Sequence, residues 1–64
     1  MAGTGPDELA VLALVARGLT VTAVARRLEI SERTERRRLR TAADDLGVDS
    51  TIEAVVAAVR RQLI

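Results

Sequence analysis

The stretch that decides the fold lies at residues 31–40 and reads SERTERRRLR. Ser31 is a favoured helix N-cap, and Glu32 places a negative charge in the first turn, where the helix dipole is positive. Four arginines then recur at the i, i+3, i+4 and i+7 spacing, which puts them on one face of a helix. These are Arg33, Arg36, Arg37 and Arg40. Leu39 points elsewhere and begins an apolar series. Such a helix, following another short helix, suits the DNA major groove.

Working outward from this stretch, the sequence predicts four helices with short connections. They are expected over residues 6–17, 21–28, 32–46 and 51–61. Gly18 and Gly47, each followed by an aliphatic residue, supply left-handed helix ends. The start signals are Pro6, Thr20, Ser31 and Ser50. Residues 1–5 are expected to be a flexible lead-in to one domain over residues 6–64.

Composition excludes several functions. The 64 residues include no cysteine and no histidine, so disulfides, zinc fingers and imidazole catalysis are ruled out. Aromatic residues are also absent, which removes base-stacking platforms. Asp44 and Asp45 are adjacent and would point in different directions on a helix, so we expect no enzyme, metal or cofactor. No membrane span or signal peptide is visible, which predicts a cytoplasmic protein.

The charge of the chain is unevenly distributed. All ten basic residues are arginine, and the net charge is +1. Residues 26–40 carry seven arginines against three glutamates, a net +4, and the rest carries three arginines against six acidic residues, a net −3. A basic pole made of arginine suits phosphates and guanine edges, which the planar guanidinium binds in bidentate fashion.

The motifs, in this order and spacing, resemble the LuxR-type (GerE-like) DNA-binding domain of bacterial transcription regulators. The carriers are Pro6, Glu8, Val11-Leu12, Ala16-x-Gly18-Leu19-Thr20, VARRL at 24–28, ISERT at 30–34, LGV at 46–48, Ser50, Glu53-Ala54 and Leu63-Ile64. The resemblance implies an all-α, four-helix bundle that contains a helix-turn-helix. Helix 32–46 would enter the major groove and helix 21–28 would brace it. No sensor domain is present, which implies a piece of a larger regulator or a standalone one.

The resemblance also assigns roles to residues. The positions that would touch base edges are Arg36, Arg37 and Arg40. Thr34 and Arg38 fall where the family holds phosphates, and Arg33 is placed with them as a neighbouring arginine. The last helix often forms the dimer contact in the family, which agrees with its excess of valine. The expected homodimer interface is therefore Val55, Val56 and Val59.

Each assignment has an alternative. The arginine face is also compatible with a solvated surface of ion pairs, Glu32–Arg36 at i+4 and Glu35–Arg38 at i+3. The Thr34 hydroxyl is able to bond its own backbone. The valines are able to complete the core. The second function is a protein-interaction module that kept the fold and lost or weakened DNA binding. It is favoured by Glu35, Asp44 and Asp45 and by the broad apolar face of helix 51–61.

Glu35 departs most from the family pattern. The family most often has valine there, a residue that packs inward beside Leu39. An unpaired carboxylate in that place is costly. We therefore expect Glu35 to be either shielded by an arginine or turned to the surface.

Overall fold

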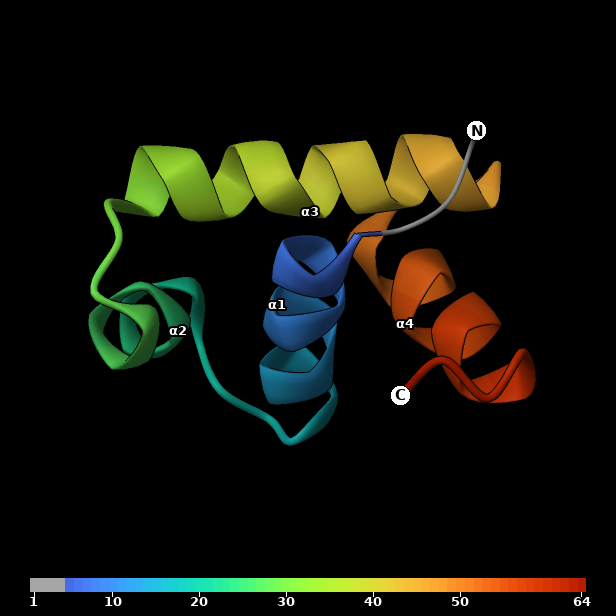
Figure 1. Cartoon of the computed structure of the whole chain (residues 1–64), viewed down its shortest axis with the longest axis horizontal. Helices are drawn as coiled ribbons and strands as arrows, with labels where there is room; N and C mark the ends of the chain where they lie inside the picture. Colours follow the sequence, from blue (N-terminus) through green and yellow to red (C-terminus); the bar gives the residue numbers. More distant parts are fainter. Residues whose placement is uncertain (1–4) are drawn as a thin grey trace.

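The computed structural model describes residues 5–64, which form four α-helices and no strand (Figure 1). The helices are α1 (Pro6–Ala16), α2 (Val21–Leu28), α3 (Glu32–Leu46) and α4 (Thr51–Arg60). The predicted all-α, four-helix fold is confirmed, and α2 and α3 have the predicted bounds. Helices α1 and α4 each end one residue earlier than predicted, because Arg17 and Arg61 are their C-caps. The predicted lead-in falls mostly on residues 1–4, which lie outside the described residues.

Three of the four helices begin with a side-chain cap. In each, a hydroxyl oxygen accepts a hydrogen bond from the backbone N–H three residues on, at 3.0 to 3.2 Å. These caps are Thr20, Ser31 and Ser50. The Ser50 hydroxyl also donates to Glu53 Oε1 at 2.8 Å. Helix α1 has only Gly5 at its N-cap, with no side-chain hydrogen bond, so its start is favoured by Pro6 and by the acidic first-turn residues Asp7 and Glu8.

Left-handed residues end the two helices of the helix-turn-helix. Gly47 closes α3 with φ 74°, and Glu29 closes α2 with φ 56°. After each, the next backbone N–H reaches back to the last turn at 2.9 Å, from Ile30 to the Ala25 carbonyl and from Val48 to the Ala43 carbonyl. Glycine adopts this conformation without strain, whereas Glu29 carries a Cβ into it.

Helix α3 lies across the other three helices and packs against all of them. In Figure 1 it runs along the top edge, with α1 central beneath it and α2 and α4 on either side. All four helices contribute to one aliphatic core. Its members are Val11, Leu12, Val24, Leu39, Ala42, Ala43, Leu46, Ala54 and Ala58. This packing buries one face of α3 along its length and leaves the opposite face free.

Candidate nucleic-acid interface

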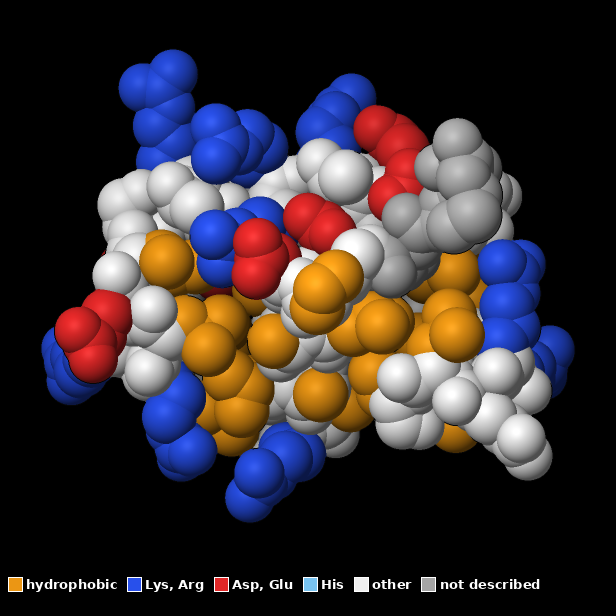
Figure 2. All heavy atoms as spheres, viewed as in Figure 1, with side chains coloured by type: hydrophobic (Ala, Val, Ile, Leu, Met, Phe, Trp, Pro, Cys, Tyr) orange, Lys and Arg blue, Asp and Glu red, His pale blue; other side chains and the backbone are white. Residues whose placement is uncertain are grey.

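The free face of α3 carries the arginines. Four arginines at the predicted helical spacing are exposed: Arg33, Arg36, Arg37 and Arg40. On the opposite face Leu39 and Leu46 are buried in the core. Figure 2 shows basic side chains projecting away from the edge along which α3 runs. The 3.6-residue period therefore separates a basic surface from an apolar one on a single helix.

Two carboxylates engage arginines of α3. Arg36 Nη2 lies 3.3 Å from Glu32 Oε1, the predicted i,i+4 pair. Arg38 Nη2 lies 3.8 Å from Asp7 Oδ2 in the first turn of α1. The other predicted pair, Glu35 with Arg38, is absent, because Glu35 turns into the core while Arg38 turns towards α1. Arg38 is consequently the least exposed of these arginines, with a quarter of its side chain accessible.

The other three exposed arginines of α3 have no carboxylate within ion-pairing distance among residues 5–64. They are Arg33, Arg37 and Arg40. All three keep their full set of N–H donors for a ligand. Because they repeat at i, i+4 and i+7, they form a row along the free face of α3.

The hydroxyl of Thr34 is hydrogen-bonded to another side chain rather than to the backbone. The Ser31 hydroxyl donates to Thr34 Oγ1 at 3.0 Å, while Thr34 N–H donates back to Ser31 Oγ at 3.0 Å. Because Thr34 Oγ1 accepts in this pair, its own proton stays available to an acceptor. Thr34 lies in the first turn of α3, where the helix dipole also favours an anion.

Glu35 is fully buried, and neither carboxylate oxygen has a hydrogen-bond partner among the described residues. The expectation that it turns to the surface is wrong, and no arginine bonds it. Desolvation raises the pKa of the Glu35 carboxyl; the charge of Arg36 lowers that pKa and the charge of Glu32 raises it further. The residue occupies the position of a core aliphatic, one helical turn before Leu39.

Comparison with known proteins places this arrangement in a family. The model of bacterial regulatory proteins of the luxR family, GerE, matches residues 6–58. The chain belongs to this LuxR family. The LuxR-family domain is a DNA-binding transcription-regulator fold, and the family is one of regulators rather than enzymes.

A solved structure similar to this LuxR-family domain is the response regulator ChrA of a heme-sensing two-component system. The two agree with a TM-score of 0.92 and 31% sequence identity over 100% of this chain. The chain spans 32% of the length of that regulator, so most of ChrA lies outside the region of similarity. No curated protein matches the chain in sequence.

Helix α4 of the LuxR-family domain presents an exposed apolar row. Ile52, Val56 and Val59 are 69%, 42% and 53% exposed, whereas Val55 is partly buried against the core. The fully buried residues of α4 are Ala54 and Ala58. Ile52 therefore belongs to the exposed row, which the i, i+4, i+7 spacing from Ile52 to Val59 could have indicated.

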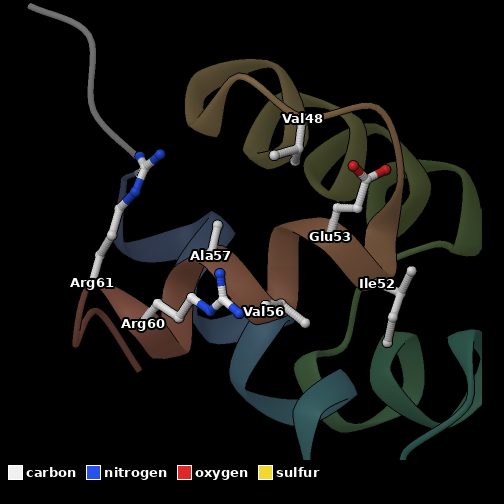
Figure 3. A pocket seen from close by; sticks show the side chains of 7 residues that line it. All are labelled: Val48, Ile52, Glu53, Val56, Ala57, Arg60 and Arg61. Carbon is white, nitrogen blue, oxygen red and sulfur yellow. The ribbon is translucent and has the colours of Figure 1, made fainter.

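A groove of about 380 Å³ follows this row. Figure 3 shows Ile52 and Arg61 near its two ends, with Glu53 towards the Ile52 end and Arg60 beside Arg61. Its apolar lining comes from Val48, Ile52, Val56 and Ala57. The groove thus combines an apolar floor with charges of opposite sign at its ends.

None of the helices formed by residues 5–64 has both the length and the apolar character needed to cross a membrane. In the same range, no three acidic side chains gather where they could hold a metal ion.

Proposed function

We propose that this chain binds double-stranded DNA in a sequence-specific manner as the DNA-binding part of a bacterial transcription regulator, with α3 in the major groove. The observation that carries the proposal is the exposed arginine face of α3, which stands opposite the core face of the same helix. A rigid helix that presents long, multidonor side chains on one side fits the width of the major groove. Residues 6–64 act as one domain, in the cytoplasm and without catalysis or a cofactor.

The residues divide into two roles in this proposal. Thr34, Arg33 and Arg38 hold phosphates, which fixes the position of α3 and supplies most of the salt-dependent affinity. Arg36, Arg37 and Arg40 read base edges, and guanine is the favoured target of a bidentate arginine. The available hydroxyl proton of Thr34 supports the first role. The exposure of Arg37 and Arg40 supports the second.

A homodimer through α4 completes the proposal. The exposed row of Ile52, Val56 and Val59 would be covered by the same row of a second copy, with Val55 packing beneath it. Two α3 helices related by a two-fold axis would then meet half-sites about 34 Å apart, one turn of B-DNA.

Selection of duplexes from a random library, followed by sequencing, tests the proposal directly. We expect enrichment of a guanine-containing motif repeated with two-fold symmetry. The triple variant with alanine at residues 36, 37 and 40 should lose the enrichment. Undiminished binding by this variant would refute the role of α3.

The second candidate function is a protein-interaction module that kept the helix-turn-helix fold. It is favoured by the buried carboxylate of Glu35 within α3, by the exposed acidic pair Asp44 and Asp45 at the far end of that helix, and by the apolar row of α4. Duplex DNA titrated at two salt concentrations separates the two functions. Salt-dependent NMR shifts in α3 favour DNA, whereas an unchanged α3 favours the interaction module.

A further inference from the structure

We propose that Glu32 is a specificity-determining residue, whose carboxylate ties the guanidinium of Arg36 to the first turn of α2 and so presents Arg36 to base edges in one orientation. The inference rests on the proposed DNA-binding function and deepens it. Glu32 itself touches no base in this view; it acts through the arginine that it holds.

The two oxygens of the Glu32 carboxylate have different partners. Oε1 accepts from Arg36 Nη2 at 3.3 Å, one turn further along α3. Oε2 accepts from Thr22 Oγ1 at 2.9 Å, across the turn of the helix-turn-helix. Thr22 is the second residue of α2 and Glu32 is the first of α3. The carboxylate therefore links the recognition arginine to the bracing helix as well as to its own.

The hydrogen bond to Glu32 leaves Arg36 able to bind a base edge. The guanidinium has five N–H donors, and only its Nη2 group donates to Glu32. The other donors remain able to make a bidentate contact with guanine. Arg36 and Arg40 also line one groove of about 490 Å³, together with Val21 of α2 and residues at the junction of α3 and α4. An arginine already held in place loses less rotamer freedom when it binds.

The charge of Glu32 acts on all DNA sequences alike. A carboxylate in the basic segment repels phosphates and lowers non-specific affinity. Specificity is the difference between the affinities for the right and the wrong site. The repulsion is common to both sites and leaves that difference unchanged, so Glu32 widens it only through the oriented contact of Arg36.

Glu29 provides a matched control. It is an exposed glutamate in the same basic segment, in the turn between α2 and α3. Its carboxylate has no ion-pair or hydrogen-bond partner among residues 5–64. Removal of its charge changes the general attraction to DNA without releasing an arginine.

The test compares the parent chain with Glu32→Gln, Thr22→Val and Glu29→Gln. Each is titrated with a duplex selected from a random library and with a duplex of the same base composition in scrambled order. Glu29→Gln should tighten both complexes by the same factor and leave their ratio unchanged. Glu32→Gln should tighten the scrambled complex and lower the ratio of affinities by about threefold to tenfold. Thr22→Val should lower the ratio without tightening the scrambled complex.

NMR relaxation of the Arg36 Nε–H group, measured without DNA, supplies a second readout. We expect this group to become more mobile in Glu32→Gln and Thr22→Val and to stay unchanged in Glu29→Gln. Equal mobility in all four proteins overturns the tie between Glu32 and Arg36.

The outcomes separate this inference from the function on which it rests. Selective binding by the parent, together with an unchanged affinity ratio in Glu32→Gln, overturns the role of Glu32 and leaves the proposed function standing. Failure of the parent to bind any duplex at low salt overturns the proposed function, and the role of Glu32 with it.

Discussion

Arg61 Nη2 donates a hydrogen bond to the carbonyl oxygen of Leu46, 3.3 Å away, and so joins the end of α4 to the end of α3. The last carbonyls of a helix lack partners within the helix, so a cation from another element stabilises them. This contact anchors the C-terminal end of α3, the end opposite Arg33.

We expect Arg61→Ala to lower the free energy of unfolding by about 0.5–1.5 kcal/mol, the typical net value of one such hydrogen bond. Urea denaturation measures the change. Arg60→Ala is the matched control, because Arg60 is the adjacent exposed arginine and has no hydrogen bond to α3 among the described residues. Equal losses in the two variants would show that the charge matters and the contact with Leu46 does not.

Glu35 should destabilise the domain at neutral pH. Replacing it with methionine, an unbranched side chain of similar size, removes a buried group with two unsatisfied oxygens. We expect Glu35→Met to raise the free energy of unfolding by about 1–3 kcal/mol at pH 7. Glu35→Gln is the control, because it removes the charge and leaves a polar group in the core. We expect Glu35→Gln to raise the free energy of unfolding by less than Glu35→Met does.

The same residue should make stability depend on pH. Burial raises the pKa of Glu35 in the folded state above its ordinary value of 4.5. The folded state therefore binds this proton more tightly than the unfolded state does. The stabilisation is complete below pH 4.5 and is lost as the pH rises through the raised folded pKa. Urea midpoints between pH 4 and pH 8, compared with those of Glu35→Gln, isolate this contribution; parallel curves for the two proteins would contradict it.

The sequence predicted local features and failed where distant segments meet. Capping residues and the Glu32–Arg36 pair act within one helical turn, so the spacing of residues was enough to predict them. Arg38 finds its partner Asp7 in the first turn of α1, which no local pattern contains. Only the packing of α1 against α3 brings the two together.

Glu35 shows a different limit, a conflict between two local rules. Its position, one turn before Leu39 on the core face, predicts burial, whereas its charge predicts exposure. In the structure, the packing of α3 against three helices buries Glu35, so its position on the helix outweighs its charge. Likewise, whether Val55 or Ile52 joins the exposed row of α4 depends on how that helix is rotated about its axis against the core.

The backbone of the turn between α2 and α3 is strained at Glu29, and a substitution there should relieve the strain. Glu29 has a left-handed backbone, with φ 56°, as does Gln62 after α4, whereas the ends of α1 and α3 use glycine at Gly18 and Gly47. We expect Glu29→Gly to stabilise the domain by about 0.5–1 kcal/mol, because relief of the Cβ clash exceeds the entropic cost of glycine. Thermal unfolding measures the gain. Glu29→Ala removes the same charge and keeps the clash, so it should show no gain.

The exposed row of α4 predicts a defined effect on association. An aspartate in place of Val56 would bury an unpaired charge in the proposed dimer, which should weaken self-association by at least about tenfold. Sedimentation equilibrium, with and without selected duplex, measures it. Ala10→Asp adds the same charge to an exposed position of α1 and should leave association unchanged. A parent chain that stays monomeric at every concentration, free and bound to DNA, would contradict the dimer.

The proposed roles of the arginines on α3 predict two distinct kinds of loss. Arg37→Ala should cost about 1–3 kcal/mol on a selected duplex and relax the preference at one base pair, because a bidentate contact with a base edge is removed. Arg33→Ala should weaken selected and scrambled duplexes by the same factor and reduce the salt slope by about one, because a phosphate contact is removed.

Binding isotherms for both duplexes at several salt concentrations distinguish these two losses. Arg17→Gln is the control, since Arg17 is exposed at the end of α1 and lies outside the proposed interface. It should change both affinities slightly and equally. If Arg37→Ala behaves like Arg33→Ala, the division between base-reading and phosphate-holding arginines is wrong, even though α3 still binds DNA.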